Sequence, residues 1–297
     1  MFEGFTKEEK KVNGISITYR IGGKGPGLLL LHGHPQTHVL WHKVAPTLAE
    51  HFTVVAADLR GYGDSGKPEA DEMHVNYSKR EMARDQTELM RALGFGTFAV
   101  MAHDRGARVA HRLCVDHADK VERAVFLDIA PTLAMYESTN EAFAKAYWHW
   151  FFLILPAPLP EKLLEDNPEL YVRSVMGRRS AGLKPFTPEA LNEYIRCLGL
   201  PGSARGICED YRASATIDLE HDREDIAAGR KVTCPLLAFW GAQGVVGKLL
   251  DPLAAWSEVA TNIQGKALPG GHYIAEEMPE ILLEEVLPFF RATGANG

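Results

Sequence analysis

Short runs of uninterrupted apolar residues recur along the chain, with helical segments between them. The runs are residues 27–31, 52–57, 98–101, 124–127 and 236–240. Runs of this length are typical of strands that are buried on both faces of a parallel sheet. Apolar residues at helical spacing occupy the segments 78–93, 105–116 and 279–291. The pattern therefore predicts an α/β fold with a mostly parallel central sheet flanked by helices.

The first residues follow a different pattern. Asn13-Gly14 is a favoured two-residue hairpin turn, and the apolar residues Ile15, Ile17 and Tyr19 alternate with polar ones after it. We therefore expect the chain to begin with an antiparallel hairpin.

The alternation of strands and helices stops between Asp128 and Lys231. This stretch is rich in aromatic residues and prolines, has helical spacing and contains no clear strand. It predicts a helical cap over residues 135–225, inserted into a core domain made of residues 1–134 and 226–297. An insert that leaves the carboxyl ends of parallel strands would cover the edge where such sheets bind ligands.

Composition and charge argue against several kinds of binding partner, namely nucleic acids, metal ions and membranes. A chain of 297 residues with net charge −7 and no basic stripe is a poor candidate for binding nucleic acid. The four cysteines are widely spaced and show no metal-ligand spacing. The first residues lack the apolar core of a secretory signal, and the most apolar segment, 146–159, is shorter than the roughly 20 residues that span a membrane. We therefore expect a cytoplasmic protein that does not associate with membranes.

The segment Ala102-His103-Asp104-Arg105-Gly106 joins a predicted strand to a predicted helix. Small residues on both sides of a central nucleophile are the pattern of the nucleophile elbow in the α/β-hydrolase fold. The usual first glycine is Ala102 here, and the central residue is Asp104 instead of serine. A carboxylate nucleophile displaces a leaving group from a saturated carbon and forms an alkyl ester.

Hydrolysis of such an ester needs a base and a group that orients it. His272, in the segment Pro269-Gly270-Gly271-His272, lies at the expected end of the chain, although it could also be a surface histidine. No carboxylate follows the 236–240 strand until Asp251. Asp128, at the end of the 124–127 strand, is therefore the better candidate for the orienting acid; its alternative role is to cap a loop.

Arg105 and Arg108 share one face at the start of a predicted helix. Cations oppose the helix dipole at this end, so another interaction should favour them there. A substrate carboxylate would do so, because guanidinium groups offer it paired donors. The alternative is that one or both arginines pair with acidic side chains.

The turn Gly33-His34-Pro35 follows the first parallel strand. The backbone N–H groups of His34 and Arg105 are the expected oxyanion hole. The nearby histidines could suggest a metal site, but metal ligands need a closed set with orienting partners. We therefore expect no metal from the cluster His32, His34, His38 and His42.

The sequence resembles the haloacetate (fluoroacetate) dehalogenase family of the α/β-hydrolases over nearly its whole length. The segments that carry the resemblance are MFEGF, LLLLHGHPQT, ADLRGYGDSGKP, HDRGAR, FLDIAPT, YWHWFF, CEDYRA and GGHY. The histidine–glycine turn and the aspartate elbow are shared with epoxide hydrolases. The ordered set, with HDRGAR and YWHWFF together, favours the dehalogenases.

The resemblance implies an Asp104–His272–Asp128 triad, with Arg105 and Arg108 binding the haloacetate carboxylate. It places hydrogen-bond donors around the departing halide, namely His149, Trp150 and Tyr211. From the residues alone, packing within the core or cap is the favoured interpretation of these aromatic side chains. The resemblance also implies a homodimer, no cofactor, and conversion of a short 2-haloacid to glycolate and halide.

Two alternatives stay open. An epoxide hydrolase would use the same triad, with Tyr147 and Tyr211 protonating the epoxide oxygen, but would leave the His149–Trp150 pair and the arginines unexplained. A non-catalytic ligand receptor of the same fold would be expected to lack a member of the triad, and all three positions are filled here.

Overall fold

The computed structural model describes residues 1–292 and contains an eight-stranded sheet in the order β1-β2-β4-β3-β5-β6-β7-β8. The strands are β1 (Phe5–Val12), β2 (Ile15–Gly22), β3 (Gly27–Leu31), β4 (Thr53–Ala57), β5 (Phe98–His103), β6 (Val121–Leu127), β7 (Leu236–Gly241) and β8 (Ile263–Leu268). β1 pairs antiparallel with β2, and β2 with β4, whereas all other pairs are parallel. The predicted α/β fold with a mostly parallel sheet is confirmed.

Every apolar run in the sequence corresponds to a strand, and the Asn13-Gly14 turn joins β1 to β2. β8 was not predicted, and neither was the length of β1. Both are edge strands with largely exposed or half-exposed side chains, so neither contains an apolar run. Central strands such as β3 are buried at every position, which is why their sequences are continuously apolar.

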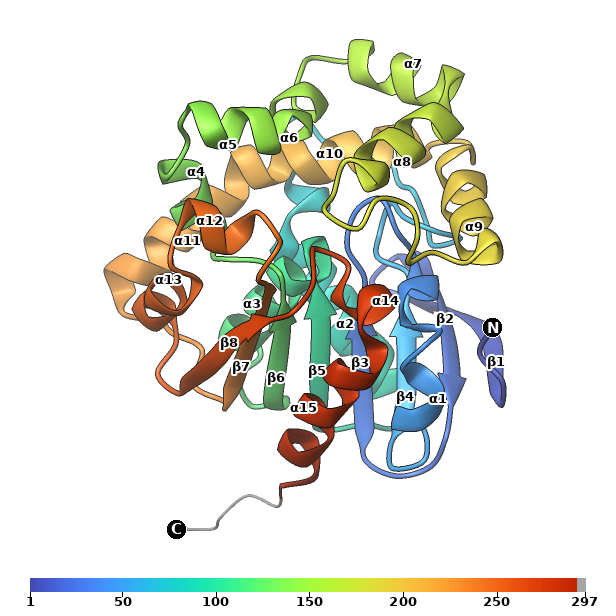
Figure 1. Cartoon of the computed structure of the whole chain (residues 1–297), viewed down its shortest axis with the longest axis vertical. Coiled ribbons are helices and arrows are strands. Elements are labelled where there is room, and N and C mark those ends of the chain that lie inside the picture. The colour runs from blue at the N-terminus through green and yellow to red at the C-terminus, as the bar shows by residue number, and fades with distance from the viewer. Residues whose placement is uncertain (293–297) are drawn as a thin grey trace.

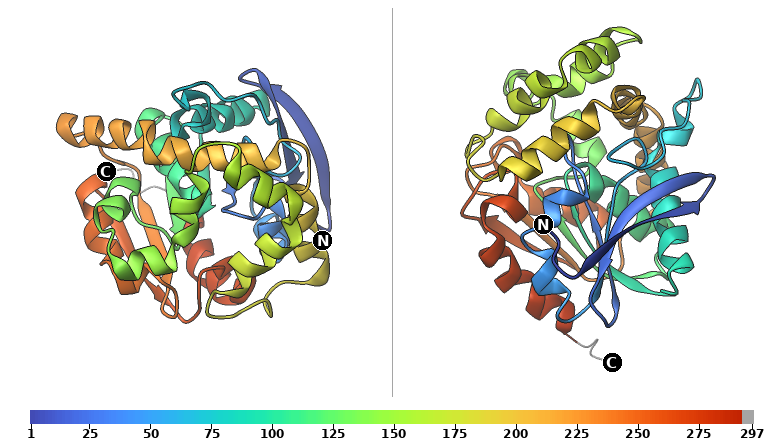
Figure 2. Two further views of the ribbon diagram at one scale, coloured as in Figure 1. Left: turned by 90° about the horizontal axis from the view of Figure 1, so that it is seen from above. Right: turned by 90° about the vertical axis from the view of Figure 1, so that its right-hand side faces the viewer.

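Helices cover both faces of the sheet (Figures 1 and 2). α1 and α15 lie on one face, and α2 and α3 on the other. The helices of the core are η1 (His38–Trp41), α1 (Ala45–Leu48), η2 (Val75–Tyr77), α2 (Lys79–Ala92), α3 (Arg105–Asp116), α12 (Val246–Leu249), α13 (Pro252–Val259), α14 (Ile274–Glu277) and α15 (Pro279–Arg291). Among residues 1–292, no helix has the length and apolar character required to cross a bilayer.

The stretch between β6 and β7 is helical and lies over the carboxyl ends of the parallel strands (Figure 1). Its helices are α4 (Thr132–Glu137), α5 (Glu141–Ala146), α6 (Trp148–Leu153), α7 (Leu159–Asp166), α8 (Pro168–Gly177), α9 (Pro188–Leu198), α10 (Ser203–Ala215) and α11 (Ile217–Ala228). α4 begins before residue 135 and α11 ends after residue 225. The division into a core domain and a cap domain at these two positions stays a prediction.

A buried hydrogen-bond network ties the insert to the core. The Gln36 amide donates to the Glu276 carboxyl at 2.6 Å, and the Tyr194 hydroxyl, on α9, donates to the same carboxyl at 3.2 Å. Burial raises the pKa of Glu276 to about 8, although Tyr194, Lys43 and Gln36 act in the opposite direction. Glu276 is therefore largely protonated in the folded protein near neutral pH.

Replacing this buried acid should change how stability depends on pH. Between pH values of about 4.5 and about 8, the folded state holds a proton on Glu276 that the unfolded state has lost. The free energy of unfolding should then fall as pH rises through this window, by up to about 1.4 kcal/mol per pH unit. Glu276→Gln should abolish this slope, and Glu280→Gln, at an exposed position of α15, should keep it. Urea unfolding across the window measures both; an unchanged slope in Glu276→Gln contradicts the assignment.

Candidate active site

Asp104 occupies a sharp turn between β5 and α3. Its backbone has φ 48° and ψ −113°, a conformation that is costly for a residue with a side chain. The turn depends on two glycines. A Cβ on Gly106 would lie 2.5 Å from the carbonyl oxygens of Leu31 and His32, and one on Gly33 would lie 2.5 Å from the Asp104 Cβ. Only glycine at positions 33 and 106 therefore allows α3 to approach β3 this closely at the elbow.

Asp104 is buried but lies among groups that favour its charge. Its Oδ1 accepts a hydrogen bond from the His34 backbone N–H at 3.0 Å. Burial would raise the pKa of Asp104, but His272, His103, the His34 N–H and Arg105 lower it below its ordinary value. Asp104 is therefore ionised at neutral pH, as a nucleophile must be.

His272 and Asp128 lie together near Asp104. The Nδ1 atom of His272 donates to Asp128 Oδ2 at 2.5 Å, and Asp128 Oδ1 accepts from the Gly241 N–H at 2.9 Å. The carboxylate thereby fixes the tautomer of the ring, with the lone pair on Nε2. The structure thus brings together the three side chains that the sequence analysis selected from separate segments of the chain.

His103 has a structural role that the sequence did not reveal. Its Nε2 lies 2.9 Å from the backbone carbonyl of His272, and the two rings are 4.6 Å apart. Because a carbonyl only accepts, Nε2 must carry the proton. Burial lowers the pKa of His103 to about 3, so the ring is neutral and positions the loop that carries His272.

The two arginines differ in their partners. Arg105 is fully buried and donates to both carboxylate oxygens of Asp210 at 2.8 Å, so the acidic pairing considered for these arginines does occur at Arg105. Arg108 donates instead to Thr132 Oγ1 at 2.6 Å and to the sulfur of Met135. Within residues 1–292, Arg105 Nη1 and Arg108 Nε are buried without a hydrogen-bond partner. Each guanidinium therefore keeps a donor for a further acceptor.

Asp210 was not identified from the sequence, although it lies in the CEDYRA segment. It also accepts from the Tyr62 hydroxyl at 2.6 Å and pairs with Lys79. Burial would raise the pKa of Asp210, but Arg105 and Lys79 lower it, so that it is ionised. Asp210 thus balances two buried cations and fixes the orientation of Arg105.

The residues expected around a halide come from α6 and α10. The rings of His149 and Trp150 lie 6.0 Å and 6.4 Å from the Tyr211 ring. The Arg105 guanidinium lies 4.0 Å from the Tyr211 ring, and the Arg108 guanidinium lies 4.7 Å from the Trp150 ring. Trp150 Nε1 is buried without a partner in the described part of the chain. The aromatic residues therefore pack in the interior, as one interpretation of the sequence expected, and also border the two arginines.

The expected oxyanion donors lie at the elbow. The His34 N–H already contacts Asp104, and Arg105 is the first residue of α3, where a backbone N–H has no acceptor four residues earlier. The His34 side chain is hydrogen-bonded to the Tyr171 hydroxyl at 3.0 Å. Burial lowers its pKa to about 3, so this ring is neutral.

The other histidines of the cluster have separate partners. His32 contacts the Gly33 carbonyl and the Leu59 N–H, His38 contacts Asp58, and His42 contacts the Val39 carbonyl. Over residues 1–292, no group of three or more His, Cys, Asp or Glu side chains is arranged to hold a metal ion.

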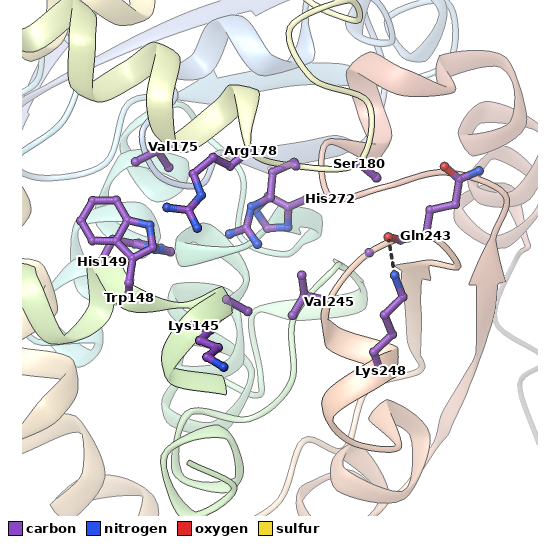
Figure 3. Close-up of a pocket in the computed structure, with 13 residues that line it drawn as sticks. Lys145, Trp148, His149, Val175, Arg178, Ser180, Gln243, Val245, Lys248 and His272 are labelled. Atoms are coloured by element: carbon purple, nitrogen blue, oxygen red, sulfur yellow. Dashed lines mark hydrogen bonds between the residues drawn. The ribbon is translucent and has the colours of Figure 1, made fainter. Parts of the chain in front are cut away.

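A cavity of about 340 Å³ opens beside these groups, with His149 and His272 in its lining (Figure 3). The remaining lining comes from the helical insert and from the loop after β7. A small molecule could thus reach His272 between the insert and the core.

Comparison with known proteins is consistent with this geometry. The family pattern described as the alpha/beta hydrolase fold matches residues 26–277. The chain belongs to the α/β-hydrolase family. It is 46% identical over 281 residues to a fluoroacetate dehalogenase from Burkholderia sp, covering 94% of this chain and 92% of that protein. The resemblance to the haloacetate dehalogenase family is therefore confirmed.

Other members of the α/β-hydrolase family are also similar over the full length. A soluble epoxide hydrolase from Corynebacterium sp. (strain C12) is 37% identical over 290 residues, with 96% of this chain and 97% of that protein covered. The crystal structure of an α/β-hydrolase-fold protein from Nostoc sp PCC 7120 superposes with a TM-score of 0.95 at 50% identity, covering 99% of this chain and 100% of that one.

Removing the charge of Asp210 should destabilise the protein strongly. Asp210→Asn would leave the buried Arg105 guanidinium without its carboxylate and Lys79 with Asp218 alone, a change that costs roughly 3–5 kcal/mol. The matched control is Asp64→Asn, which breaks partly exposed ion pairs with Lys7 and Arg196 and should cost about 1 kcal/mol or less. Denaturant unfolding measures both; equal losses would show that Asp210 does not balance these buried charges.

Proposed function

We propose that the protein hydrolyses short 2-haloacids such as fluoroacetate or chloroacetate to the 2-hydroxyacid and halide, through an ester on Asp104. The observation that carries the proposal is the arginine pair. Among residues 1–292, Arg105 and Arg108 each hold a buried donor without a partner, close to the ionised Asp104. A substrate carboxylate would satisfy both donors and offset its own repulsion from Asp104. The identity to a fluoroacetate dehalogenase supports the same substrate class.

In the first step, an Asp104 oxygen attacks the halogen-bearing carbon, forming the ester C–O bond as the carbon–halogen bond breaks. The departing halide takes the bonding electron pair and needs hydrogen-bond donors as its charge develops. The indole N–H of Trp150, a ring N–H of His149 and the Tyr211 hydroxyl can supply them. Burial, Arg179 and His34 lower the pKa of His149, so it would donate as a neutral ring.

In the second step, His272 Nε2 takes a proton from water, and the resulting hydroxide attacks the carbonyl carbon of the ester. The His34 and Arg105 backbone N–H groups would hold the oxyanion, and Asp128 would stabilise the imidazolium. Collapse breaks the bond between the acyl carbon and the glycolate oxygen, which takes the proton from His272. Asp104 is left as a carboxylic acid with one oxygen derived from water, and it regains its carboxylate by releasing the remaining water proton to solvent.

Halide release tests the proposal directly. The wild-type protein should release halide from at least one of fluoro-, chloro- and bromoacetate, whereas Asp104→Asn should release none and Asp119→Asn, at an exposed position, should keep the activity. His272→Ala should retain a carboxymethyl ester on Asp104, visible by mass spectrometry. Turnover in ¹⁸O-water should label Asp104. No halide from any of the three substrates would overturn the proposal.

The arginine assignment has its own test. Arg108→Gln should lower kcat/KM for chloroacetate by about 10–100-fold, since a hydrogen bond to a charged group contributes roughly 1.5–3 kcal/mol. Arg108→Lys should recover part of the loss, because it restores the charge without the paired donors. A KM that is unchanged in both variants, with unfolding temperatures near that of the wild type, would rule out a carboxylate clamp at Arg108.

A second candidate is epoxide hydrolysis by the same triad. It is favoured by the similarity to the Corynebacterium enzyme and by the Tyr147 hydroxyl, which is buried without a hydrogen-bond partner among residues 1–292. Diol formation from styrene oxide, without halide release from haloacetates, would select this reaction instead.

By resemblance to the dehalogenases we further propose a homodimer that acts in the cytoplasm without a cofactor; analytical ultracentrifugation tests the dimer.

A further inference from the structure

The cavity beside His149 and His272 has a strongly basic lining. Lys145 contributes from α5, Arg178 and Arg179 from the segment after α8, and Lys248 from α12. Of the residues that the structure describes, no aspartate or glutamate lines the cavity. Figure 3 shows that Arg178, Lys145 and Lys248 come from different elements around the same space as the two histidines.

Most of these cations lack a balancing charge. Lys145 pairs with Glu141, but in the described part of the chain Arg178, Arg179 and Lys248 have no carboxylate within ion-pair distance. The Lys248 ammonium donates only to the backbone carbonyl of Gln243, at 3.2 Å. Like charges gathered without counter-charge repel one another, so a bound anion would stabilise this arrangement.

The nearby acids are occupied elsewhere. The Glu277 carboxylate accepts the backbone N–H groups of Gly271 and Tyr273 at 2.6 Å and 2.9 Å. Asp128 is held by His272 and the Gly241 N–H. Asp104 is the nucleophile itself. None of these carboxylates is free to neutralise the cavity.

The basic residues also lie in order from solvent to the site. Lys145, Arg178 and Lys248 are exposed, whereas Arg179 is half-buried, with its guanidinium 5.2 Å from the Tyr147 ring. Burial would lower the pKa of Arg179, but Tyr147, Tyr273, Asp128 and Asp104 raise it, so it stays charged. A path that passes the exposed cations thus ends at a guanidinium near the catalytic carboxylates.

We propose that this cavity is a second anion-binding site, which takes a small monocarboxylate at Arg178, Arg179 and Lys248. It is separate from the Arg105–Arg108 pair and would hold substrate or product between solvent and the nucleophile. Only the identity of the natural ligand rests on the proposed function; binding of a carboxylate does not. Basic clefts of this kind raise the local concentration of anions and speed their association, by an amount that falls with ionic strength.

Acetate tests the site without turnover, because it has no leaving group. Relaxation of ¹³C-acetate titrated into the wild-type protein should report two acetates per chain. The double variant Arg178→Gln/Lys248→Gln, at two exposed positions, should bind one, and Arg108→Gln should lose the other. The control Lys10→Gln/Lys11→Gln removes the same charge from the exposed strand β1 and should bind both. An Arg178/Lys248 variant that binds as many acetates as the wild type overturns the proposal.

Kinetics give a second, independent readout. At low salt, the Arg178/Lys248 double variant should lower kcat/KM for chloroacetate about tenfold, and the loss should shrink at high salt as the charges are screened. The Lys10/Lys11 variant should match the wild type at both salt concentrations. A loss that does not depend on salt contradicts the steering role. If no haloacetate releases halide, the proposed function fails, whereas the acetate titration still decides whether the second site exists.

Discussion

The buried ion pair between Arg105 and Asp210 is the interaction on which the site depends. Arg105 begins the helix after the nucleophile, and Asp210 lies on α10 of the insert, so the pair fixes the insert relative to the elbow. Both side chains are fully buried, and removing one partner from such a pair leaves an uncompensated charge in a medium that solvates it poorly. The position of every residue on α10, including Tyr211, is therefore coupled to that of Asp104.

Arg105 has a carboxylate partner and Arg108 does not, and this difference favours a bound anion near Arg108. Asp210 compensates Arg105 and Lys79, whereas Arg108 has only the neutral partners Thr132 and Met135. Burial and the neighbouring Arg105 lower the pKa of Arg108. A neutral substrate would leave that charge uncompensated, but a carboxylate would balance it. Within residues 1–292, the positive charge of Arg108 thus has no carboxylate partner and lies near Asp104, which is itself negative.

The sequence predicted those features whose residue types are determined by their immediate surroundings. Strands buried on both faces must be apolar throughout, and the elbow needs small residues beside Asp104, so both leave a pattern in the chain. The edge strand β8 leaves none, because its side chains are largely open to solvent. Asp210, the contact of His103 with the His272 carbonyl, and the basic cavity could not be predicted in this way. Each depends on how segments far apart in the sequence pack together, and periodicity carries no information about that packing.

The three residues of the predicted triad and the residues around them come from different parts of the fold. Asp104, His272 and Asp128 all come from the core, at the ends of strands whose positions the sheet determines. The groups that would distinguish a haloacid from an epoxide come mostly from the insert, apart from Arg105 and Arg108 at the elbow helix. An epoxide would leave the free donors of both arginines buried and unpaired, at a cost of roughly 1–3 kcal/mol each. A carboxylate would satisfy both, so the free donors of the two arginines favour an anionic ligand over a neutral one.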